Sequence, residues 1–112
     1  MDLDVITIAE LIWFVKVHQP GATLRNLSGL DVKVGNYFPP KGGPEIEKSL
    51  ERLLADMNTI SSYHAHIAYE KLHPFTDCNG RSGRMLWAWQ ERDISLGFLH
   101  AFYYQTLAHS RR

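Results

Sequence analysis

Breaks that contain proline divide this chain into segments with apolar residues at helical spacing, and this pattern restricts the fold more than any other feature. Pro44 stands where the first turn of a helix accepts proline, because the N–H group that proline lacks has no partner there. The apolar residues that follow recur three or four positions apart: Ile46, Leu50, Leu53, Leu54 and Met57. Farther along, the residue before Pro74 avoids helical angles, so a helix must end there. The pattern predicts a mainly α fold.

The same spacing and the same breaks predict where the individual helices lie. We expect helices at residues 7–18, from Pro44 onward, from Ser61 or Ser62 to Leu72, from about Gly80, and at residues 101–109. Thr7 and Glu10 have the spacing of a capping box, which favours a helix start at the first of these positions.

One segment has the period of a strand instead of a helix. Leu30, Val32 and Val34 alternate with Asp31 and Lys33, and Gly35-Asn36 follows as a turn. A period of two that ends at a turn is typical of a β-hairpin. We therefore expect a short strand or β-hairpin within the otherwise helical fold.

Length and charge narrow the class of protein. A chain of 112 residues is expected to form a single domain over residues 1–112. Its 12 basic and 12 acidic residues cancel, so no overall field draws it to nucleic acid or membrane, and any phosphate must be held locally. A single cysteine excludes internal disulfides, and no stretch resembles a signal peptide or a membrane span. We expect a soluble, cytoplasmic protein without nucleic-acid or membrane partners.

The stretch HPFTDCNGRSGR, residues 73–84, contains the groups that a phosphate site requires. Asn79 and Gly80 follow a loop and open a helix, where free N–H groups and the positive end of the helix dipole favour an anion. Arg81 and Arg84 are three residues apart, so both project from the first turns and can neutralise phosphate charge. These residues predict a phosphate-binding helix N-terminus.

Two further groups in this stretch suit chemistry on a bound nucleotide. His73 ends the preceding helix, and its ordinary pKa suits proton removal from a hydroxyl near neutral pH. Asp77 offers the single carboxylate that commonly shares Mg²⁺ with bound phosphates. Pro74 fixes the backbone, and Phe75 is expected to anchor the loop in the core. Each group has a plain structural alternative, but their combination in one loop indicates a site.

The stretch resembles the motif of the Fic-domain (Fic/Doc) family, HPF-x-[D/E]-G-N-G-[R/K]-x-x-R. The matching positions are His73, Pro74, Phe75, Asp77, Asn79, Gly80, Arg81 and Arg84. Cys78 departs from it, because glycine is usual there. The likeness extends over roughly residues 21–107, because GNYFPP and IEKSLERLLADMN resemble the flap and the following helix of such proteins. The segment SSYHAHIAYEKLHPF resembles the helix that leads into the active loop.

The resemblance implies a protein AMP-transferase, which moves AMP from ATP to a Ser, Thr or Tyr hydroxyl of a target protein. It implies His73 as general base and Asp77 as ligand of Mg²⁺. The residues implied in nucleotide binding are Cys78, Asn79, Gly80, Arg81 and Arg84. The flap residues Val32, Lys33, Val34 and Tyr37 would align the target by adding a strand. Tyr103 or Tyr104 is a further candidate for the adenine pocket, against the plainer alternative that both belong to the core.

Cys78 admits two interpretations. A helix N-terminus and the neighbouring Arg81 favour a thiolate and are expected to lower the pKa of the thiol, although Asp77 acts in the opposite direction. Oxidation of such a thiol would block the phosphates. The alternative is that cysteine is simply a small replacement for glycine.

Three other functions are alternatives to AMP transfer. The Doc branch of the family is a protein kinase with lysine at the position of Gly80 and alanine at that of Cys78, so Gly80 favours AMP transfer. A non-catalytic interaction module would not need His73, Asp77 and both arginines intact. A metal site on His64 and His66 is disfavoured, because residues two apart lie on diverging faces of a helix.

Regulation is expected to involve a second protein. Many relatives carry an inhibitory motif, [S/T]-x-x-x-E-[G/N], and this chain does not contain it. The chain is also short for the family. The resemblance therefore implies either a separate, antitoxin-like inhibitor or an enzyme without this control.

Overall fold

The structure is a computed structural model, which describes residues 6–91 of the chain. Within this range the order of elements is α1 (Ile8–His18), α2 (Pro44–Asp56), α3 (Ser62–Leu72) and α4 (Asn79–Gln90). The mainly α fold is thus confirmed, and each of these helices begins within a residue or so of its predicted start. The expected helix at 101–109, with Tyr103 and Tyr104, lies outside the described residues.

Local sequence explains where these helices begin. The Thr7 side chain accepts a hydrogen bond from the Glu10 N–H at 3.2 Å, and the Glu10 carboxylate accepts one from the Thr7 N–H at 3.0 Å. This reciprocal pair is the predicted capping box. Ser61 caps α3 by accepting from the His64 N–H at 3.1 Å. Pro44 occupies the first turn of α2, as its missing N–H allows.

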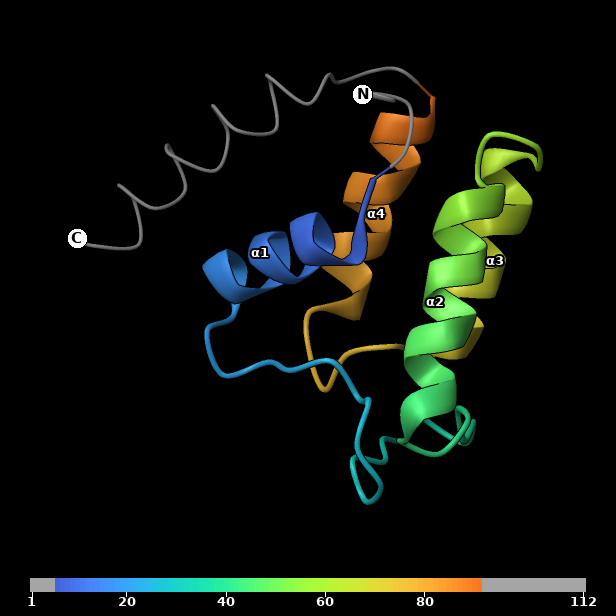
Figure 1. The fold of residues 1–112 in the computed structure, drawn as a ribbon. Helices are drawn as coiled ribbons and strands as arrows, with labels where there is room; N and C mark the ends of the chain where they lie inside the picture. Colours follow the sequence, from blue (N-terminus) through green and yellow to red (C-terminus); the bar gives the residue numbers. More distant parts are fainter. Residues whose placement is uncertain (1–5, 92–112) are drawn as a thin grey trace.

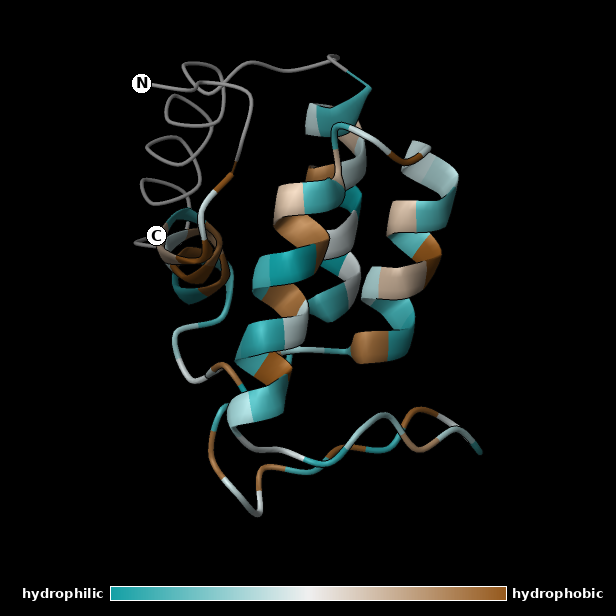
Figure 2. Ribbon diagram, turned by 45° about the vertical axis from the view of Figure 1, so that its right-hand side comes forward, coloured by the Kyte–Doolittle hydropathy of each residue, from teal (hydrophilic) through white to brown (hydrophobic). Residues whose placement is uncertain are grey.

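The helices enclose one apolar core. In Figure 1, α2 and α3 lie side by side, α4 stands to their left, and α1 lies crosswise to α4 on its other side. Figure 2 shows hydrophobic residues, in brown, that recur along α1 and α2 between hydrophilic ones. Side chains with at most 3% of their surface exposed make up this core, among them Leu11, Val15, Ile46, Leu50, Leu54, Tyr69, Phe75, Leu86 and Trp89. The predicted anchor Phe75 is therefore a core residue.

The predicted β-hairpin is reduced to a single antiparallel pair. Val34 and Tyr37 exchange two backbone hydrogen bonds of 2.9 Å each around the Gly35-Asn36 turn. Gly35 has φ +60°, which glycine adopts without steric cost. Residues 30–33 have no ladder partner within the described chain, so alternation alone did not produce a strand.

A second backbone pairing positions the loop between α3 and α4. Leu24 and Phe75 form an isolated antiparallel bridge. The Arg25 N–H donates to the Pro74 carbonyl at 2.8 Å, and the Thr76 N–H donates to the Thr23 carbonyl at 2.9 Å. The segment just after α1 therefore holds the loop that carries the motif. No helix within residues 6–91 is long and apolar enough to cross a membrane.

Candidate active site

The motif residues surround one cavity of about 330 Å³ at the N-terminus of α4. The motif residues predicted as base, metal ligand and nucleotide-binding residues all line it: His73, Asp77, Cys78, Asn79, Gly80, Arg81 and Arg84. Gln19 and Thr76 also line the cavity, and neither was predicted. Gln19 comes from the end of α1, which no local motif marks as part of a site.

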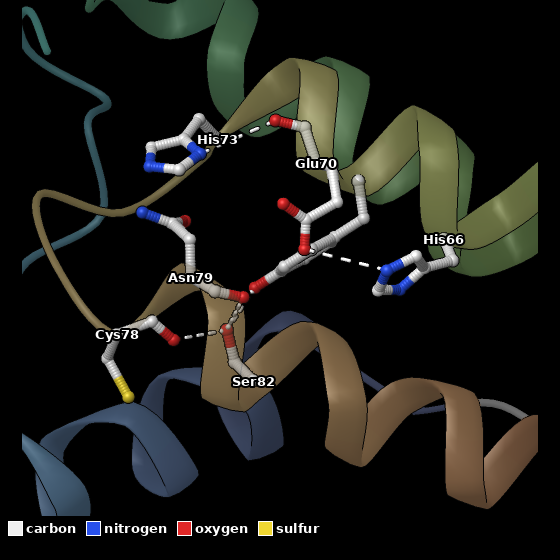
Figure 3. A network of polar contacts seen from close by, with 7 residues as sticks. His66, Glu70, His73, Cys78, Asn79 and Ser82 are labelled. Atoms are coloured by element: carbon white, nitrogen blue, oxygen red, sulfur yellow. Dashed lines mark hydrogen bonds and ion pairs between the residues drawn. The ribbon is translucent and has the colours of Figure 1, made fainter. Parts of the chain in front are cut away.

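The backbone turns sharply at His73, which ends α3 with φ +48° and ψ +61°. The following proline disfavours right-handed helical angles at this residue. The His73 N–H still donates to the Tyr69 carbonyl at 2.9 Å, so the turn closes the helix. Its ring Nδ1 lies 3.4 Å from the Glu70 carbonyl oxygen (Figure 3). A carbonyl only accepts, so this contact favours the proton on Nδ1 and leaves Nε2 with the lone pair that a general base needs.

The side chain of Asn79 is hydrogen-bonded to the loop between α3 and α4. Its amide donates to the Phe75 carbonyl at 2.7 Å, and its carbonyl accepts from the Phe75 N–H at 2.9 Å. Only 3% of the residue is exposed. Asn79 therefore shapes the loop through its side chain, and what it offers to an anion is its backbone N–H in the first turn of α4.

Cys78 precedes α4 with φ +70° and ψ +16°, a left-handed conformation that favours glycine. Its N–H donates to Asp77 Oδ1 at 2.7 Å. Burial raises the pKa of the Cys78 thiol, and this effect outweighs the opposing charges of Arg81 and Arg84. The expected lowering of this pKa was wrong, because the half-buried sulfur packs against the core.

The buried hydroxyl groups of Ser82 and Tyr69 form hydrogen bonds that support the loop at the cavity. The Ser82 hydroxyl donates to the Cys78 carbonyl at 2.8 Å (Figure 3). Its oxygen lies 2.6 Å from the Tyr69 hydroxyl of α3. Burial raises the pKa of Tyr69 well above its ordinary value, so the phenol stays protonated and can donate to Ser82. At Gly83, an added Cβ would lie 3.2 Å from the Tyr69 ring. The small residues of the motif thus permit α3 and α4 to approach closely.

Arg81 has a neighbour from a different helix. Its Nη1 lies 3.3 Å from His18 Nδ1, at the end of α1. Arginine only donates, so His18 must accept through an unprotonated Nδ1. Burial and then the charge of Arg81 lower the pKa of His18, which favours this neutral form. Arg81 and Arg84 themselves are exposed at the cavity.

The predicted flap residues lie apart from the cavity lining. Lys33, Val34 and Tyr37 are exposed and Val32 is half-buried. The Tyr37 hydroxyl donates to the Lys71 carbonyl at 2.9 Å, so the flap is attached to the end of α3. Residues 6–91 contain no group of three or more histidine, cysteine, aspartate or glutamate side chains placed to share a metal ion.

The Fic/DOC family model matches residues 6–90 of this chain. The chain therefore belongs to the Fic/DOC family. Curated proteins and solved structures give no match to it.

Proposed function

We propose that this protein transfers AMP from ATP to a hydroxyl group of a target protein in the cytoplasm. The proposal is carried by one observation: a histidine whose Nδ1 lies near the Glu70 carbonyl oxygen and a helix N-terminus flanked by two arginines line the same 330 Å³ cavity. Membership of the Fic/DOC family supports it, because AMP transfer is typical of that family.

The chemistry follows from these groups. His73 Nε2 takes the proton of the target hydroxyl as its oxygen attacks the α-phosphorus of ATP. The bond from that phosphorus to the bridging oxygen breaks, and pyrophosphate leaves with the bonding electrons. The N–H groups at the start of α4, together with Arg81 and Arg84, stabilise the charge that develops on the phosphates.

Asp77 is the candidate ligand for Mg²⁺. Among the residues of the described range, 6–91, that line the cavity, it is the acidic one. A single carboxylate fits Mg²⁺, which usually takes one or two carboxylates and completes its shell with phosphate oxygens and water. When bound with ATP, the ion would neutralise phosphate charge beside Asp77.

The test uses ATP labelled at the α- or γ-phosphate, a cell lysate as the source of targets, and the purified protein. We expect label from α-labelled ATP on a protein band, and loss of this label by about 10²- to 10⁴-fold in His73→Ala. His64→Ala is the matched control, because His64 is exposed on α3 and does not line the cavity. Near wild-type labelling by His73→Ala contradicts the assignment. Product from γ-labelled ATP alone identifies a Doc-like kinase, and no labelling by the folded protein favours a non-catalytic module.

A separate inhibitory protein is the second part of the proposal. The inhibitory motif, whose glutamate pairs with the second arginine of the family motif in many relatives, does not occur in residues 1–112. An antitoxin-like partner would insert an acidic group beside Arg84. Expression alone should then slow growth, and co-expression of the partner should restore it. Harmless overexpression of an enzyme that is active in the labelling assay contradicts this part.

A further inference from the structure

The end of α3 receives its hydrogen bonds from a distant part of the chain. The last carbonyls of a helix have no partner within it and must find one elsewhere. Here the Lys71 carbonyl accepts from the Tyr37 hydroxyl at 2.9 Å, and the Leu72 carbonyl accepts from Arg25 Nη2 at 2.8 Å. Just beyond the helix, the His73 carbonyl accepts from Arg25 Nε at 2.7 Å. The carbonyl of the candidate base is therefore held by an arginine 48 positions earlier.

Arg25 joins this helix end to the flap segment. Its Nη1 donates to the carbonyls of Leu30 at 3.1 Å and Pro40 at 2.8 Å. Those two residues stand on either side of the flap. The guanidinium thus bridges four backbone carbonyls, two at the end of α3 and two at the base of the flap.

Arg25 is fully buried, so its guanidinium depends on these hydrogen bonds for stability. The residue is 0% exposed, and burial lowers its pKa while the charge of Asp31 partly offsets that effect. A buried cation is costly unless it is well hydrogen-bonded, and the planar fork of arginine can serve carbonyls on both sides at once. Lysine carries a single point of charge and cannot span both sides.

We infer that Arg25 is a positioning residue for His73, and that it couples the position of the flap to that of the base. The inference rests on the proposed function of His73. Arg25 does not line the cavity, so it acts through the backbone of His73. The left-handed backbone angles of His73 place its ring beside the Glu70 carbonyl. Arg25 donates to the backbone carbonyl of His73 itself, so it restrains the residue whose ring is the candidate base.

The phosphate side of the site has its own support. Asn79 closes the loop on Phe75, and Ser82 holds the Cys78 carbonyl. Neither contact involves the Arg25 side chain. Loss of the guanidinium fork should therefore disturb transfer and spare nucleotide binding.

The main experiment compares wild type with Arg25→Lys, and uses Arg52→Lys as the matched control because Arg52 is exposed on α2. Fluorescent ATP with Mg²⁺ reports binding, and α-labelled ATP at saturation reports transfer. For Arg25→Lys we expect unchanged Kd for the nucleotide and a rate of transfer lower by about 10- to 100-fold, the cost of a misplaced catalytic group. Equal losses in binding and transfer, or wild-type transfer by the folded variant, overturn the inference.

A second readout separates this inference from the proposed function. If wild type transfers no label, the proposed function fails, and Arg25 is judged by NMR alone. Support requires that Arg25→Lys shift the His73 ring signals while the Asn79 and Ser82 amide signals stay in place. Unchanged His73 signals overturn the inference.

The wild-type protein provides a test that holds even where Arg25→Lys does not fold. Four hydrogen bonds should stop rotation of the guanidinium, so the two Nη groups of Arg25 should give separate ¹⁵N signals. A single averaged Nη signal for Arg25 overturns the bridge and the inference with it.

Discussion

Asn79 and Phe75 form a closed ring of two hydrogen bonds, in which the side-chain amide of one residue pairs with both backbone groups of the other. The two residues are four positions apart, and both are almost fully buried. The ring fixes the loop between α3 and α4 independently of any ligand. The cavity therefore has its shape without a bound ligand, which is the preorganisation that charge stabilisation would require in the proposed function.

Removal of this ring should weaken the whole fold. In Asn79→Ala the buried N–H and carbonyl of Phe75 lose their partners, so we expect the free energy of unfolding to fall by about 1–3 kcal/mol. Urea unfolding measures this change. Asn36→Ala, in the exposed turn of the flap, should stay within about 0.5 kcal/mol of wild type. Equal effects of the two substitutions would contradict the role of Asn79.

The left-handed backbone at Cys78 predicts a difference between two substitutions. Cys78→Gly and Cys78→Ala both remove the thiol, so their comparison isolates the backbone. Glycine adopts φ +70° without steric cost, whereas the Cβ of alanine makes this conformation unfavourable. The glycine variant should therefore be more stable than the alanine variant by about 1 kcal/mol in urea unfolding. The reverse order would show that the Cys78 backbone is unstrained, and both variants should still transfer AMP if the proposed function holds.

The raised pKa of the Cys78 thiol predicts slow alkylation. The thiolate is the reactive form, and less of it is present at neutral pH when the pKa is raised. Iodoacetamide should modify native Cys78 more slowly than a free thiol at pH 7, and the rate should still be rising above about pH 8.5. Mass spectrometry over time measures the rate. A fast reaction that is independent of pH near neutrality would show that Cys78 is a thiolate. It would then support the interpretation that oxidation of Cys78 blocks the phosphates.

His18 predicts a pH dependence of stability. Its pKa is lowered in the folded protein, so the unfolded chain binds a proton first as the pH falls. The free energy of unfolding should therefore decrease on acidification through the ordinary histidine range, near pH 6.5, and this loss should end below the folded pKa. Urea unfolding from about pH 7.5 to about pH 5 measures the slope.

The matched variant is His18→Gln, which keeps a hydrogen-bond acceptor for Arg81 and does not titrate in this range. Its stability should depend less steeply on pH than that of wild type. If the free energy of unfolding depends on pH equally in the two proteins, His18 is not the cause of the pH dependence.

Local signals in the sequence predicted the helices, because caps and proline breaks act over a few residues. The structure has each of the helix termini that these signals predicted. Two of them are starts, marked by Thr7 with Glu10 and by Pro44, and one is the end of α3 before Pro74. The alternation of residues 30–34 did not produce a hairpin beyond one pair, because a strand requires a partner that this pattern does not specify.

The motif contains most of the residues that line the cavity, because those residues are contiguous in the sequence, but it did not indicate Gln19 or Thr76. The contacts that support the cavity were not predicted either. Nothing near Arg25 marks it as a bridge to His73, and nothing near Asn79 shows that its side chain turns inward. The raised pKa of the Cys78 thiol was not predicted for the same reason, because its burial depends on residues distant in the sequence.

The pairing of residues 23–25 with residues 72–76 also governs when the site can exist during folding. The motif occupies one short stretch, but its backbone is held by residues about fifty positions earlier, as Thr23 with Thr76 and Arg25 with His73 show. Contacts of such separation form only after a long loop has closed, and they slow folding relative to local contacts. The nascent α3–α4 hairpin would thus carry every motif residue and still lack the cavity. Catalytic competence in this chain should arise at the end of folding, and it should be the first property lost when α1 and the flap detach.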